Sequence, residues 1–177
     1  NFIDSKIKTN KLEMININSD GIDSDFSTFE FNNLNCLDIG NDCLDISFSK
    51  GELNQFFSKN VADKALSIGE KSILKIKEAK INYSEMGIVA KDSSKVFVEE
   101  LLLKKVKIPI ALYIKKQEFG SPLLNIKNKL DDNYIKDSFI SLDSDFINNK
   151  TIIPGKLTSK KIKNLFYGNE YGVKTKR

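Results

Sequence analysis

Acidic side chains recur along the chain at a spacing that would bring them onto one surface. Asp23 and Asp45 occupy the same place in two similar segments, "GIDSDFS" and "CLDISFS", which begin 22 residues apart at Gly21 and Cys43. A third segment, "ALSIGEK", begins 22 residues later at Ala65. Carboxylates stacked in this way repel each other unless a cation or a raised pKa relieves the repulsion. Calcium, which prefers carboxylate oxygens, is the cation that this pattern suggests.

The outward positions of the repeat change from acids to lysines, and they supply the candidate site residues. The predicted calcium ligands are Asp23, Asp25, Asp42 and Asp45. The residues predicted for catalysis are Glu70, Lys91, Asp92 and Lys115. The residues predicted for substrate binding are Asp45, Lys71, Tyr113 and Lys116. A lysine would serve as the base of a uronate lyase if a neighbouring cation lowered its pKa, whereas inverting hydrolysis would need two carboxylates roughly 6.5–9.5 Å apart.

The amino-acid composition excludes several kinds of site. The 177 residues include no histidine, which removes Ser-His-Asp and Cys-His catalysis and every histidine metal site. Tryptophan is also absent, which weakens the case for a sugar-stacking platform. The only two cysteines, Cys36 and Cys43, predict two buried thiols in separate elements. No apolar run approaches the roughly 18 residues of a membrane span, and no signal peptide is visible.

The charge of the chain is unevenly distributed. The formal net charge of +4 combines −4 over residues 1–90 with +8 over residues 91–177. Such a gradient can steer a charged partner. The basic stretches "KLTSKKIKNLF" and "KTKR" are short and match no nucleic-acid motif. The other half of the chain, residues 1–90, is acidic. Nucleic acid is therefore the least favoured partner.

The repeat predicts strands with one buried face. Two further segments begin at Gly87 and Ala111, and the five segments align an aliphatic residue after each first position. That column reads Ile22, Leu44, Leu66, Ile88 and Leu112. Mostly polar residues stand between the aliphatic ones, which is typical of a half-buried strand. A unit of about 22 residues indicates one coil of a parallel β-helix, because helical repeats need about 33–45 residues.

The aligned segments resemble the right-handed parallel β-helix repeat proteins of the pectate-lyase-like superfamily. The resemblance covers residues 13–127 and rests on "DGIDSDFS", "NDCLDISFS", "DKALSIGEKS", "GIVAKDSSKV" and "ALYIKKQEFG". The chain is similar to a branch of bacterial surface proteins in which such modules accompany kinase-like spore-coat domains. Most proteins of this branch have no assigned activity. The resemblance implies a polysaccharide lying along the solvent face of the stacked strands.

We predict one all-β domain, a right-handed parallel β-helix of about five to six coils with a C-terminal cap. Residues 1–130 form the coils, and residues 131–177 form an irregular last coil and the cap. The stretch "TSKKIKNLFYGN" predicts a short helical lid that begins at Thr158 or Ser159 and ends at Gly168. Because the chain starts at Asn1 rather than Met, we expect it to belong to a larger chain at the cell surface or outside the cell.

Two functions from different classes fit this sequence. The first is binding of an acidic or neutral polysaccharide, with processing by a lyase or glycoside hydrolase left open. The second is a non-catalytic structural or protein-interaction module within a larger protein. A deep groove lined by the outward columns favours the first function, and a flat face with every charge paired favours the second.

Overall fold

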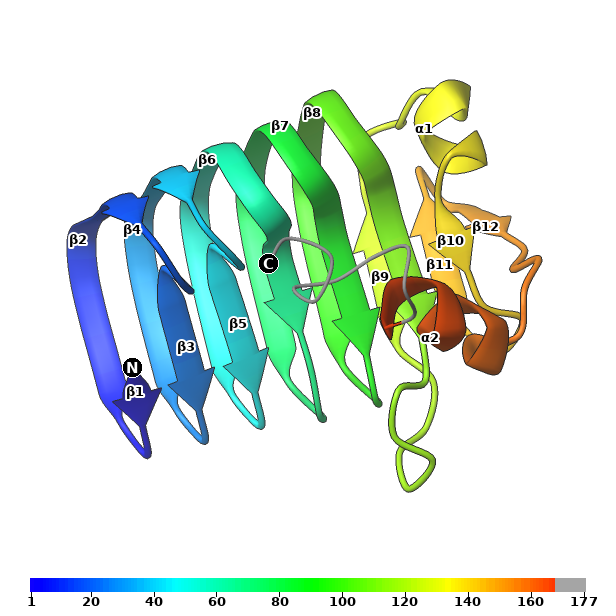
Figure 1. Ribbon diagram of the computed structural model, residues 1–177, viewed down its shortest axis with the longest axis horizontal. Helices are drawn as coiled ribbons and strands as arrows, with labels where there is room; N and C mark the ends of the chain where they lie inside the picture. The colour runs from blue at the N-terminus through cyan, green and yellow to red at the C-terminus, as the bar shows by residue number, and fades with distance from the viewer. Residues whose placement is uncertain (168–177) are drawn as a thin grey trace.

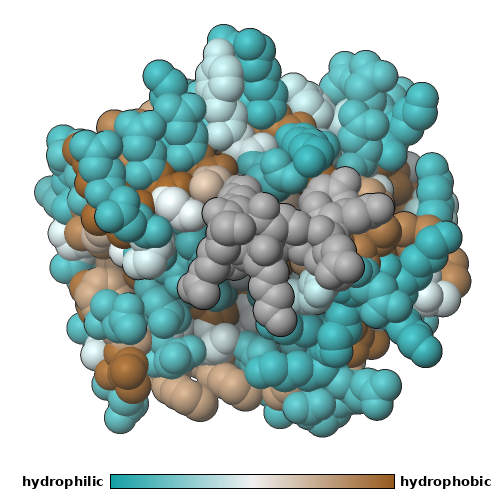
Figure 2. Space-filling model, in the orientation of Figure 1, coloured by the Kyte–Doolittle hydropathy of each residue, from teal (hydrophilic) through white to brown (hydrophobic). Residues whose placement is uncertain are grey.

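The computed structural model describes residues 1–167. It confirms an all-β parallel solenoid, with about seven coils instead of the five to six predicted. Figure 1 shows the coils stacked in sequence order from the N-terminal end to a cap that holds both helices. Figure 2 shows one side of the molecule, which is covered largely by hydrophilic side chains with apolar ones visible between them.

The strands and helices follow one another in the order given next. They are β1 (Phe2–Ile3), β2 (Lys6–Ile17), β3 (Ile22–Asp25), β4 (Thr28–Ile39), β5 (Leu44–Ser47), β6 (Lys50–Ile68), β7 (Ile73–Lys91), β8 (Lys95–Tyr113), β9 (Leu123–Ile126), α1 (Asp132–Lys136), β10 (Phe139–Ile140), β11 (Asp145–Asn148), β12 (Thr151–Ile153) and α2 (Ser159–Tyr167). No helix in the described part of the chain is long and apolar enough to cross a membrane.

Each coil pairs in parallel with the next, and the register of the first face confirms most of the predicted columns. We call the first face the surface formed by β1, β3, β5 and the C-terminal ends of β6, β7 and β8. On it Asp23 pairs with Asp45, Asp45 with Ser67 and Ser67 with Val89. The carboxylates of the first coils are therefore stacked, as the 22-residue spacing predicts.

The predicted register of the next coil is wrong by two residues. Val89 pairs with Ala111, and Lys91 pairs with Tyr113. Tyr113 therefore continues the column of Lys91, and Lys115 lies beyond the strand. The reason is that Ile110 and Leu112 both point inward, and a shift of two residues keeps every side chain on its own face. Alternation alone cannot distinguish these two registers.

The core is built from the predicted inward residues. The aliphatic column is fully interior, and each of its members is at most 3% exposed. The predicted members are Ile22, Leu44, Leu66, Ile88 and Leu112, although in the observed register Ile110 rather than Leu112 stacks on Ile88. Aromatic side chains fill another part of the interior, where Phe29 and Phe31 stack with ring centroids 4.8 Å apart. Hydrophobic burial of these ladders is the main stabilising contribution to the solenoid.

The long strands change direction at corners with left-handed backbone. One corner column is Asn16, Asp38, Asn60, Tyr83 and Lys105, and every φ in it is positive. Asparagine and aspartate adopt this conformation more readily than other non-glycine residues. Each turn of the solenoid therefore has several faces, of which the first face is only one.

The two cysteines form a disulfide, which corrects the prediction of two thiols. Cys36 lies in β4 and Cys43 lies immediately before β5, with their Cα atoms 6.0 Å apart and both residues fully buried. The chain folds back between them at Gly40, where a Cβ would lie 2.5 Å from the carbonyl oxygen of Asn18. Both cysteines belong to one coil, and the turn between β4 and β5 brings their sulfur atoms together, which the cysteine spacing alone does not reveal.

Replacing both cysteines with alanine is expected to lower the free energy of unfolding by about 2–3 kcal/mol, because a small closed loop is removed from the unfolded chain. Chemical denaturation of the wild type and of the Cys36→Ala/Cys43→Ala variant measures the loss. Thiol titration of the denatured wild type should find thiols only after reduction. Two reactive thiols before reduction would show that the bridge is not formed.

The cap confirms the predicted helix. Thr158 Oγ1 accepts a hydrogen bond from the backbone N–H of Lys161, as an N-cap residue does. Ile162 and Phe166 of α2 are buried against the C-terminal half of the first face. The predicted stop at Gly168 and the basic stretch "KTKR" lie outside the described residues.

Candidate functional site

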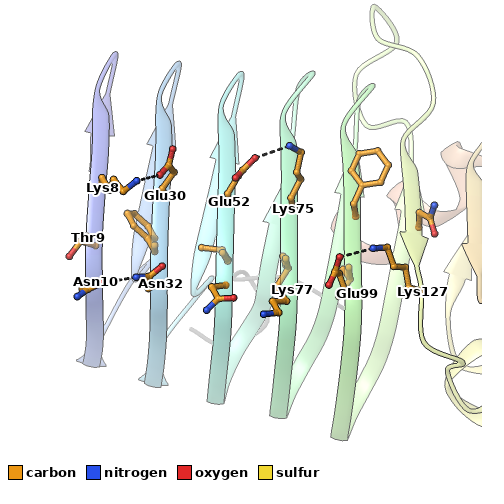
Figure 3. A pocket seen from close by; sticks show the side chains of 17 residues that line it. Lys8, Thr9, Asn10, Glu30, Asn32, Glu52, Lys75, Lys77, Glu99 and Lys127 are labelled. Carbon is orange, nitrogen blue, oxygen red and sulfur yellow. Dashed lines mark hydrogen bonds and ion pairs between the residues drawn. The ribbon is translucent and has the colours of Figure 1, made fainter.

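A groove lies along the solenoid where β2, β4, β6, β7 and β8 turn from one face to the next. It is lined by two rows of outward side chains, and its volume is about 590 Å³. Figure 3 shows the rows running across successive coils. The first row is Lys8, Glu30, Glu52, Lys75, Phe97 and Asn125. The second row is Asn10, Asn32, Asn54, Lys77, Glu99 and Lys127.

A second hollow of about 480 Å³ continues the groove around its edge. The two hollows share Asn54, Lys77, Glu99 and Lys127. The groove therefore extends along the stack of coils, and it suits an elongated ligand better than a small compact one.

Ion pairs between neighbouring coils neutralise most charges in the groove. The distances between ammonium and carboxylate are 2.6 Å for Lys8–Glu30, 2.7 Å for Lys75–Glu52 and 2.6 Å for Lys127–Glu99. These side chains are exposed, so each pair contributes little to stability. Their effect is to leave the groove almost neutral along its length.

Two glutamates of the groove, Glu30 and Glu99, are held in the ionised form. The hydrogen bond from Lys8 lowers the pKa of Glu30, and the hydrogen bond from Lys127 lowers the pKa of Glu99. A general acid for glycoside hydrolysis needs the opposite shift, because it must be protonated near neutral pH. These carboxylates can accept hydrogen bonds from a ligand, but they are poor proton donors.

The second row begins with amides that can bind hydroxyl groups. Asn32 donates a hydrogen bond of 2.5 Å to the side-chain oxygen of Asn10, as Figure 3 shows. Each amide offers both donors and an acceptor, which matches the dual character of a sugar hydroxyl. Phe97, 37% exposed, adds one apolar surface to the row of charges.

Sequence reasoning missed this groove. The residues that form it do repeat, because Asn10, Asn32 and Asn54 lie 22 residues apart. This regular asparagine spacing was the available signal. The acid-to-lysine change on the first face drew the prediction elsewhere.

The structure places most of the predicted catalytic residues in buried contacts on or beside the first face. Lys116 Nζ lies 2.5 Å from a carboxylate oxygen of Glu70, and Lys91 Nζ donates to Ser67 Oγ at 3.0 Å. Burial opposes ionisation of Glu70, but the hydrogen bonds from Lys116 and Ser47 outweigh it and lower the pKa of Glu70. These contacts give the side chains structural partners.

Asp92 and Lys115 also have structural partners. The fully buried Asp92 accepts hydrogen bonds from the backbone N–H groups of Lys115 and Lys116, at 2.7 and 2.9 Å. Lys115 Nζ lies 4.7 Å from the centre of the Tyr167 ring. Asp92 thus anchors the turn after β8. A catalytic role for these residues stays a prediction.

The predicted substrate-binding residues are dispersed. Tyr113 is fully buried under α2, with its hydroxyl 3.3 Å from that of Tyr167. Lys71 lies at an exposed corner, 5.9 Å from the centre of the Phe119 ring. Asp45 lies at the acidic end of the first face, next to Asp23. These residues do not share one open surface.

The predicted calcium ligands are only partly brought together. Burial raises the pKa of Asp23, and the charges of Asp25 and Asp45 raise it further. Asp42 points instead toward Lys64, whose Nζ lies 3.2 Å from its carboxylate. Among residues 1–167, no three acidic or cysteine side chains converge on a position that could hold a metal ion. The calcium site stays a prediction that this geometry does not favour.

A buried charged triad surrounds Asp42, one of the predicted calcium ligands. Lys64 Nζ lies between Asp42 and Asp63, at 2.6 Å from the carboxylate of Asp63. Burial disfavours the charged form of Lys64, but the two carboxylates outweigh it and raise the pKa of Lys64. Asp42 and Lys64 lie 22 residues apart, so the repeat contained the signal for this contact.

No protein-family model, curated protein or solved structure matches the chain. The parallel solenoid therefore stands on the geometry of the coils alone. Membership of the pectate-lyase-like superfamily stays a prediction.

Proposed function

We propose that the chain is a non-catalytic binding module that holds a neutral polysaccharide in the groove. The observation that carries this proposal is the pair of continuous rows of amide and ion-paired side chains along the coils. Neighbouring strands lie about 4.8 Å apart, so the rows present polar groups at regular intervals to an extended polymer.

The near neutrality of the groove supports a neutral rather than an acidic polymer. The lining of its first hollow contains the four lysines Lys8, Lys75, Lys77 and Lys127 and the three glutamates Glu30, Glu52 and Glu99. A polyuronate would need unpaired cations along its length. Each of these three glutamates takes one lysine as its partner, which leaves little positive charge for a carboxylate ligand.

The ionised state of Glu30 and Glu99 in the groove supports binding without catalysis. The first hollow of the groove is lined by the carboxylates of Glu30, Glu52 and Glu99, and the pKa values of Glu30 and Glu99 are lowered by lysine neighbours. Hydrolysis needs a proton donor beside the glycosidic oxygen. Glu30 and Glu99, which are held ionised by their lysine partners, do not meet that requirement.

The disulfide supports a cellular location of this protein outside the reducing cytosol. Disulfides such as Cys36–Cys43 persist in oxidising compartments and are rare in cytosolic proteins. We therefore propose that the module lies at the cell surface or in the extracellular space, where it would encounter polysaccharides.

Affinity electrophoresis through gels that contain a neutral β-glucan, a neutral mannan or polygalacturonate tests the proposal. The wild type should be retarded by at least one neutral polymer and not by polygalacturonate. The Asn32→Ala/Asn54→Ala variant should bind about ten-fold more weakly, because two groups that bind hydroxyls are lost.

The Asn133→Ala/Asn164→Ala variant is the matched control, because both asparagines are exposed and lie on helices outside the groove. It should be retarded like the wild type. Equal retardation of the groove variant, or retardation by polygalacturonate alone, would contradict the proposal.

The first coil favours a structural or protein-interaction module as the second candidate function. Within residues 1–167, β2 pairs only with β4, so its other backbone edge is available to a further strand. Ile7, Leu12 and Met14 of this coil are only partly buried. If no polysaccharide binds, this edge becomes the first place to seek a partner.

A further inference from the structure

A pocket in the C-terminal cap has an apolar lining and is separate from the groove. It has a volume of about 710 Å³ and lies between the end of β8, the segment from α1 to β10, and the chain after β12. Its lining includes Ile108 and Ile140, which are 2% and 5% exposed, together with Phe139, Ile153 and Leu157. Pockets of this volume and apolar character are typical of small-molecule sites.

Lysines surround the apolar lining of this pocket. Lys107, Lys136 and Lys156 contribute to the wall, and all three are exposed to solvent. The only acidic residue in the wall is Asp137. An additional carboxylate, that of Glu85, lies 2.7 Å from Lys107 Nζ. Three positive and two negative groups leave a single positive charge, which matches a monoanion.

We propose that this pocket binds a single-chain anionic amphiphile, such as a free fatty acid. The hydrocarbon chain lies against Ile108, Phe139 and Ile153, where its removal from water is favourable. The carboxylate faces Lys136 and Lys156, which form no ion pair within the described residues. The proposal is independent of polysaccharide binding in the groove.

Isothermal titration with laurate, held below its critical micelle concentration, tests the proposal. Laurate should bind the wild type at one site, whereas acetate and dodecyltrimethylammonium should not. Acetate lacks the apolar chain, and the ammonium compound carries the wrong charge. Lys136→Gln/Lys156→Gln should weaken laurate binding about ten-fold, because the charge opposite the carboxylate is lost.

Lys59→Gln/Lys95→Gln is the matched control, because it removes the same charge from exposed positions outside the pocket. Unchanged laurate binding in this control is the expected result. Absence of laurate binding to the wild type, equal weakening in both variants, or equal binding of the cationic amphiphile would overturn the proposal. Retardation by neutral glycans should be the same in both variants, so the two proposals can fail separately.

Discussion

Leu66→Ala is expected to lower the free energy of unfolding by about 3–4 kcal/mol, because a buried leucine is lost and the surrounding coils close the cavity only partly. Leu66 is 0% exposed and pairs with Leu44 on one side and Ile88 on the other. Strands held on both sides have little freedom to move into the vacated space. Urea denaturation followed by circular dichroism measures the loss.

Leu142→Ala is the matched control, because the same atoms are removed from a side chain that is 62% exposed. It should change the free energy of unfolding by about 0.5 kcal/mol or less. Similar losses in the two variants would show that the aliphatic column is not the interior of the solenoid.

The second large effect is a pH dependence that originates at Asp42. Burial raises the pKa of Asp42 from 3.8 to about 6, since the attraction of Lys64 does not compensate for lost hydration and for the charge of Asp63. The folded protein therefore holds this proton more tightly than the unfolded chain does. This contribution to stability is complete below about pH 4 and is lost as the pH rises through about 6, by about 3 kcal/mol.

The comparison of wild type with Asp42→Asn isolates this contribution. Other carboxyl groups titrate in the same range and affect both proteins equally. Between pH 4 and pH 7 the stability of the variant should rise by about 2.5 kcal/mol relative to the wild type, because its amide does not titrate. Unfolding free energies that change in parallel with pH would rule out a raised pKa at Asp42.

The proposed groove and the predicted site differ because burial is decided between distant parts of the chain. Helix α2 covers the C-terminal half of the first face, and its first residue Ser159 accepts a hydrogen bond from the backbone N–H of Ile114. Tyr113 is thereby removed from solvent. A helix was predicted at this place in the sequence, but its docking position depends on packing with coils that precede it by dozens of residues.

Local patterns in the sequence determined the repeat and its inward faces. The 22-residue spacing predicted the stacking of Asp23 on Asp45, and alternation predicted the burial of Leu44 and Leu66. The same spacing was present at Asn10, Asn32 and Asn54, although it did not show that the chain turns there to form a groove. Such patterns are readable because the direction of a side chain in a strand depends on its immediate neighbours.

Only the tertiary structure decided which columns are open and which distant groups meet. It set the register in which Lys91 pairs with Tyr113, joined Cys36 to Cys43, and placed Lys64 between two carboxylates. Two registers that differ by two residues bury the same faces, so only packing against the adjacent coil distinguishes them. The sequence by itself therefore determined a coil, and the contacts between coils determined the candidate sites.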